Sequence, residues 1–78
     1  MAHSSAATVR LHRALYMQQA IKEAMQTFAD FAAFQLVRDG EHYVVTIADI
    51  DPDADGDVAA EFSNFALHNT MMRKKKRI

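Results

Sequence analysis

The stretch FQLVRDGEHYVVTI, residues 34–47, decides the fold because it holds two runs of β-forming residues joined by Asp39-Gly40. An Asp-Gly pair between two alternating runs is typical of a tight β-hairpin turn whose two central residues both take positive φ. With Asp39 and Gly40 in the turn, the predicted strand pairs are Arg38 with Glu41, Leu36 with Tyr43, and Phe34 with Val45.

This register sorts the hairpin into two faces, because successive side chains of a strand point to opposite sides of the sheet. The first face is apolar and is expected to form the core; it carries Phe34, Leu36, Tyr43, Val45 and Ile47. The second face is only half apolar; it carries Gln35, Val37, His42, Val44, Thr46 and Ala48. We therefore expect Val37 and Val44 to lie on a face that is partly wet or is covered by a partner.

Before the hairpin, the hydrophobic pattern predicts a strand and a helix. Val9 and Leu11 alternate with polar residues, which indicates a short strand over residues 8–13. From Met17 the apolar residues recur at three- and four-residue steps, which predicts an amphipathic helix of about four turns. Its apolar positions are Met17, Ile21, Ala24, Met25, Phe28 and Phe31. Leu15 and Tyr16 offer no side-chain acceptor for the first amides, so no good N-cap marks its start.

After the hairpin, an acidic stretch leads into a second helix. Its predicted core stripe is Val58, Phe62, Phe65 and Met72, with Asn69 inside the stripe. The element order β-α-β-β-α predicts an α+β fold in which a three-stranded sheet has two helices packed on one face. The pattern leaves open whether the first strand pairs with the second or the third. We expect a disordered N-terminal arm over residues 1–7, a single domain over 8–72 and a basic C-terminal tail over 73–78.

Size and composition exclude several classes of protein. The 78 residues are enough for one domain, half of them are apolar, and the five Phe supply core material. The absence of cysteine excludes a disulfide framework and a thiolate metal site. No apolar run approaches the roughly 18 residues that span a bilayer, and the polar start does not resemble a signal peptide. A cytoplasmic protein without a transmembrane segment is therefore expected.

Charge is strongly segregated along the chain. The formal net charge is −1, yet residues 73–77 carry five positive charges, so the rest of the chain carries −6. Such a basic run could bind anions, and the candidate residues are Arg73, Lys74, Lys75, Lys76 and Arg77. A nucleic-acid-binding protein normally has a basic face on its folded part, so the acidic body argues against nucleic acid as the main partner.

The acidic stretch DPDADGDVAAEF, residues 51–62, partly resembles a calcium loop. Its candidate ligands are Asp51, Asp53, Asp55 and Glu61. The twelfth loop position, where a bidentate carboxylate is needed, is Phe62, and Glu61 points about 100° away from it on a helix. The alternative is that Asp55 or Asp57 caps the helix that follows. A cation-binding module is therefore the runner-up among the predicted functions.

No catalytic arrangement is recognisable in the sequence. The histidines at 3, 12, 42 and 68 lack the three- or four-residue spacing of a helical metal pair, although His12 and His42 would approach each other if the first and third strands were neighbours. The only glycines are Gly40 and Gly56, so there is no glycine-rich phosphate loop. We expect neither enzymatic activity nor a bound cofactor.

A second apolar strip lies on the last helix. Leu67 and Met71, together with Ala60, fall nearly opposite Phe62, where a domain of this size has nothing to cover them. Methionine in such a strip suits adaptable contacts. One interpretation is that these are scattered exposed apolar side chains. The other, with Val37 and Val44 included, is a surface that binds a protein or peptide partner or a second copy of the chain as a homodimer.

Two segments carry a family resemblance. LYMQQAIKEAMQTF at 15–28 and EFSNFALHN at 61–69 resemble the small D component of the bacterial His-Xaa-Ser peptide-maturation systems, whose gene clusters include radical SAM proteins. The similarity spans about residues 9–69, with Phe62, Phe65 and Leu67 keeping the family's hydrophobic character while Glu61 and Asn69 depart from its pattern. The resemblance implies an accessory protein that helps partner enzymes to modify a peptide and has no catalytic centre of its own.

Overall fold

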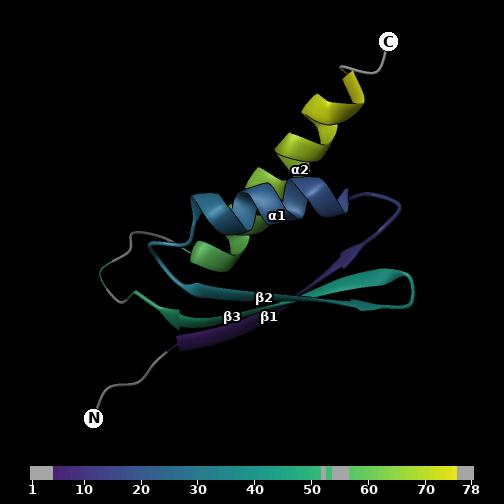
Figure 1. The fold of residues 1–78 in the computed structure, drawn as a ribbon. Coiled ribbons are helices and arrows are strands. Elements are labelled where there is room, and N and C mark those ends of the chain that lie inside the picture. Colours follow the sequence, from purple (N-terminus) through teal and green to yellow (C-terminus); the bar gives the residue numbers. More distant parts are fainter. Residues whose placement is uncertain (1–4, 52, 54–56, 76–78) are drawn as a thin grey trace.

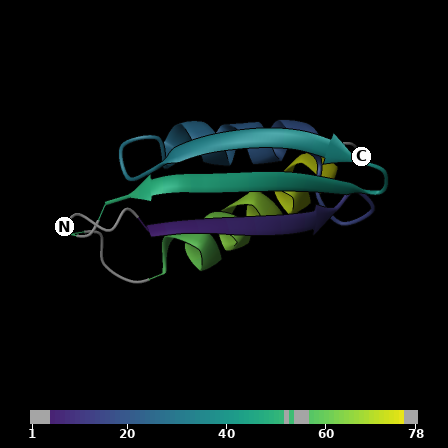
Figure 2. The same ribbon diagram turned by 90° about the horizontal axis from the view of Figure 1, so that it is seen from below.

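The protein is a two-layer α+β domain in a computed structural model that describes residues 5–51, 53 and 57–75. Its elements are β1 (Ser5–His12), α1 (Gln18–Thr27), β2 (Ala33–Asp39), β3 (His42–Ile50) and α2 (Val58–Lys75). The strands form an antiparallel sheet in the order β1-β3-β2, and both helices lie on one face of it (Figure 1). Figure 2 shows the helix-free face, with α1 behind β2 and the start of α2 behind β1. The predicted fold class and element order are confirmed.

The hairpin forms where the sequence predicts it, but its register differs by two residues. Asp39 pairs with His42, so Gly40 and Glu41 occupy the turn. Among the described residues only Gly40 (φ +60°) and Asp49 (φ +53°) have positive φ. The turn therefore needs positive φ only at its first central residue, as a type II′ turn does, and glycine adopts that conformation without steric cost. Because the shift is even, the predicted assignment of side chains to the two faces is unchanged.

β1 pairs with β3, which answers the question that the sequence leaves open. The strand begins at Ser5, so residues 5–7 belong to the sheet and the predicted arm over 1–7 is too long. The register shifts between Ser5 and Ala7, where β3 has one more residue than β1. This extra residue is accommodated near Asp49, and aspartate is among the few residues that tolerate the left-handed conformation.

The core lies between the helices and the sheet, and Phe62 is at its centre with no exposed surface. The helical phase that places Phe62 inward is therefore confirmed. Phe62 packs near Phe34 of β2 and Phe28 after α1, with ring centroids 4.9 and 6.3 Å away. The buried residues of this core cluster are Leu11, Ile21, Ala24, Ala32, Val45, Ile47, Phe62 and Ala66.

Both helices depart from the predicted stripes at their C-terminal ends. α1 ends at Thr27, so Phe31, predicted to lie on the helix stripe, is in the following loop and is 43% exposed. On α2 the buried residues follow a four-residue step, Val58, Phe62, Ala66 and Thr70, and the predicted core residue Met72 is exposed. α2 also continues to Lys75, through part of the predicted tail.

Thr70 and Arg73 of α2 form hydrogen bonds that connect the two helices. The amide of Met17, the N-cap residue of α1, donates to Thr70 Oγ1 at 3.0 Å, and the Thr70 hydroxyl donates to the Ala66 carbonyl at 2.9 Å. Further along, the Arg73 guanidinium donates two hydrogen bonds to the Glu23 carboxylate, of which Nε to Oε1 is 3.2 Å. The start of α1, which has no cap of its own, is therefore held by a buried hydroxyl of the other helix.

Candidate partner-binding surfaces

β2 is an edge strand, and alternate backbone groups along it point away from the sheet. Arg13 N–H donates to the Glu41 carbonyl at 2.9 Å, which extends the pairing of β1 with β3 by one residue pair. Hydrogen-bonded pairs alternate along an antiparallel ladder, so the odd-numbered residues of β3 form their backbone hydrogen bonds with β1. The even-numbered residues of β3 then bond to their odd-numbered partners in β2. It follows that the amides and carbonyls of Phe34, Leu36 and Arg38 face outward.

This edge has little of the protection that proteins normally give to exposed strands. The seven residues of β2 contain neither Pro nor Lys, and its pairing with β3 shows no register shift. Its charged residues, Arg38 and Asp39, both stand at the end next to the turn. The opposite edge, β1, does have a register shift, so β2 is the edge better suited to accept a further strand.

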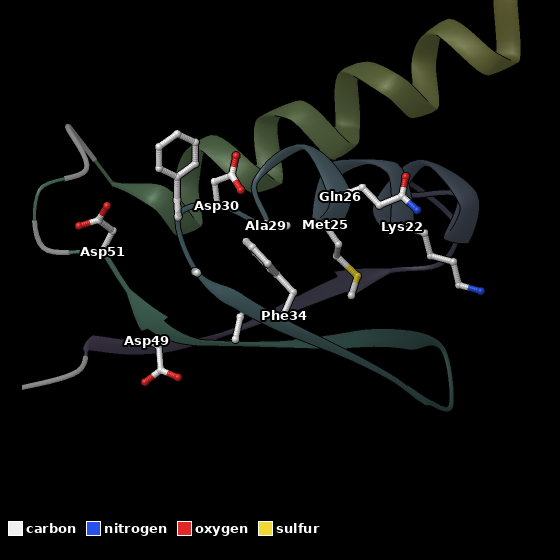
Figure 3. Close-up of a pocket in the computed structure, with 11 residues that line it drawn as sticks. Lys22, Met25, Gln26, Ala29, Asp30, Phe34, Asp49 and Asp51 are labelled. Carbon is white, nitrogen blue, oxygen red and sulfur yellow. The ribbon is translucent and has the colours of Figure 1, made fainter.

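An open groove of about 960 Å³ lies between α1, the loop that follows it and the start of β2, where Ala33 and Phe34 line it (Figure 3). Met25 points from α1 toward the strand, and Phe34 points from β2 toward the helix. One end is acidic, with Asp30, Asp49 and Asp51, whereas Lys22 lies at the other end. The sequence interpretation misses this groove because it places Phe31, one of the lining residues, on the buried helix stripe.

The helix-free face of the sheet carries the predicted residues Val37 and Val44, which are cross-strand partners. Val37 is 57% exposed and Val44 is half-buried, and Arg10 of β1 lies on the other side of Val44. Further along this face His12 is paired with His42, and the two rings meet edge to face with centroids 4.9 Å apart. The predicted approach of the two histidines is confirmed, and His12 Nδ1 accepts a hydrogen bond from the Ala14 amide at 3.0 Å.

α2 carries the predicted strip on its outer side. Leu67 is 36% exposed and Met71 54% exposed, while Phe62, Ala66 and Thr70 are buried on the side that faces the sheet and α1. Ala60 is also exposed, as expected. The helix is thus apolar on two sides, of which the fold covers one.

The described part of the acidic stretch acts as a helix start. The Asp53 amide donates to Asp51 Oδ1 at 2.9 Å, and the Ala60 amide donates to Asp57 Oδ1 at 3.2 Å, so Asp57 caps α2. Glu61 is exposed, and Asp55 lies outside the described residues. Across residues 5–51, 53 and 57–75 no group of three His, Asp or Glu side chains is arranged to hold a metal ion. Calcium binding by the whole loop stays a prediction.

The charge of Arg73, the first residue of the basic run, is already paired. Its hydrogen bonds to Glu23 raise the pKa of Arg73 above its usual value, and they attach this part of α2 to α1. Lys74 and Lys75 are exposed, whereas Lys76 and Arg77 lie outside the described residues. Anion binding by this run stays a prediction, with Arg73 contributing to the fold.

Comparison of the chain with protein-family models, with curated proteins and with solved structures finds no match. Neither helix, as far as the structure describes them, is long and apolar enough to cross a membrane. The fold and its surfaces thus define a small α+β domain with apolar groups exposed along one sheet edge, on the helix-free face and on the outer side of α2.

Proposed function

We propose that this protein is a non-enzymatic interaction module that binds an extended segment of a protein or peptide partner along β2. The observation that carries this proposal is the unprotected β2 edge beside an apolar groove. Strand addition at such an edge uses backbone hydrogen bonds for affinity and a neighbouring pocket for side-chain selectivity. The bound segment is a peptide, a strand of another protein or a strand of a second copy.

The family resemblance fits this role. It implies an accessory protein in peptide maturation, and a strand-binding edge would let such a protein hold an extended substrate for a partner enzyme. The C-terminal half of α2 extends away from β2 (Figure 1), so the exposed Leu67/Met71 strip on it remains available for that enzyme. In the cytoplasm such a module would act by presenting one molecule to another.

The proposal is tested by selecting binders from a random library of extended peptides and mapping them by amide hydrogen exchange. Bound peptides should slow exchange at Phe34, Leu36 and Arg38, while the inward amides of Gln35 and Val37 are already protected by β3. Arg38→Pro removes one outward amide and should weaken binding, whereas the matched control Arg38→Ala keeps the amide and should bind. Peptides that bind both variants equally, or that protect amides away from β2, would refute the proposed site.

A further inference from the structure

We propose that β2 pairs with β2 of a second copy, so that two molecules form a symmetric homodimer. This inference rests on the proposed function, because it names the strand that occupies the same edge. Pairing the two edges antiparallel joins two three-stranded sheets into one continuous sheet of six strands. A two-fold contact requires that one surface patch be complementary to itself, and β2 meets this requirement in its backbone, its side chains and its charge.

The outward backbone groups fix the register of the dimer. Antiparallel strands exchange hydrogen bonds between residues whose amides and carbonyls face each other. In β2 these residues are Phe34, Leu36 and Arg38, so the register that uses all of them places Leu36 opposite Leu36 and Phe34 opposite Arg38. Any other register leaves at least one outward pair of backbone groups without a strand partner.

The side chains in this register are compatible on both faces. On the side of the sheet that faces the helices, the half-buried Leu36 of each copy meets its equivalent, and the half-buried ring of Phe34 lies beside the Arg38 guanidinium, an arrangement that favours a cation–π contact. On the helix-free side, the exposed Val37 comes next to Gln35 of the other copy. The dimer therefore covers part of the apolar surface that a single molecule leaves exposed.

Charge complementarity supports the same arrangement. The groove is acidic near the start of β2, where Asp30, Asp49 and Asp51 line it together with Phe34. Arg38 stands at the opposite end of the strand, and antiparallel pairing brings it to the Phe34 end of the other copy. The two-fold axis makes this contact occur twice, so each acidic groove end receives one arginine.

The experiment is light scattering of the purified protein at concentrations up to about 1 mM, where even a weak dimer is populated. The mass should rise from 8.8 kDa to twice that value. Arg38→Glu should raise the dimer dissociation constant at least about tenfold, and adding Asp30→Lys to it should restore part of the affinity. The matched control is Arg10→Glu, an exposed strand arginine on the other edge, which should leave the dimer intact.

Hydrogen exchange identifies the surface. In the dimer the amides of Phe34, Leu36 and Arg38 should become protected as concentration rises, while those of Gln35 and Val37 should not change. A protein of 8.8 kDa at every concentration overturns the inference, and the peptide selection then decides the proposed function separately. A dimer whose outward β2 amides exchange freely, or a double variant no more dimeric than Arg38→Glu, also overturns it.

Discussion

Thr70 supplies the side-chain hydrogen-bond acceptor that the residues before α1 lack. The residue is 1% exposed, and its hydroxyl accepts a hydrogen bond from the Met17 amide at the helix start and donates one to the Ala66 carbonyl. Thr70→Val keeps the shape of the side chain but leaves that amide without a partner, so we expect the free energy of unfolding to fall by about 1–2 kcal/mol. Urea unfolding measures the loss. Thr70→Ser, which keeps the hydroxyl but lacks the methyl group, should lose clearly less; a larger loss for Thr70→Ser than for Thr70→Val would mean that the methyl group matters more than the hydrogen bond.

The same residue shows why the end of the α2 stripe could not be predicted. The inward position of Phe62 follows from sequence because few other large apolar residues compete with it nearby. From Leu67 to the end of the helix the apolar residues are Leu67, Met71 and Met72, and the last two are adjacent, so they point about 100° apart. Hydrophobicity alone therefore does not determine which side of this part of α2 is buried. The choice comes from the way α2 crosses α1, which buries Thr70 and leaves Met72 exposed.

For the hairpin, the hydrophobic pattern predicts which side chains share a face of the sheet, but it does not predict which residues pair across the strands. The alternation of apolar residues determines which side chains share a face, and that prediction is confirmed. A shift of two residues leaves this alternation unchanged, so only the turn geometry decides the register. Asp39-Gly40 and Gly40-Glu41 are both suitable turn pairs, and the structure adopts the second, in which Gly40 alone needs positive φ.

The two possible turns, Asp39-Gly40 and Gly40-Glu41, predict different losses of stability when residue 39 is mutated. Gly40→Ala should destabilise the protein by about 1–2 kcal/mol because φ is +60°, and no atom lies within 4 Å of the added carbon, so the cost is conformational. Asp39→Val should cost little, since Asp39 is an exposed strand residue with an ordinary φ. Thermal unfolding of the two variants tests this difference. An equally large loss for Asp39→Val would indicate that Asp39 occupies the turn.

The β2 edge and the groove depend on the whole arrangement and could not be read from the sequence. The strand order, which makes β2 an edge, is not encoded in local periodicity. The groove forms because α1 ends at Thr27, so that the loop with Asp30 and Phe31 opens beside β2. The predicted surfaces on Val37, Val44, Leu67 and Met71 needed only the phase of a strand or a helix, and these residues lie exposed or half-buried, as expected.

Because both helices pack on one face of the sheet, the residues that stabilise the molecule differ from those proposed to bind a partner. The outer strip of α2 takes no part in the core, so Leu67→Ser combined with Met71→Ser should change the free energy of unfolding by no more than about 0.5 kcal/mol per site. Phe62→Ala, by contrast, removes a fully buried ring and should cost about 3–5 kcal/mol, a large part of the stability of a domain this small. Urea unfolding compares the variants directly. A loss for the double variant that approaches that of Phe62→Ala would place the strip inside the fold, and it could then no longer serve as a surface for a partner.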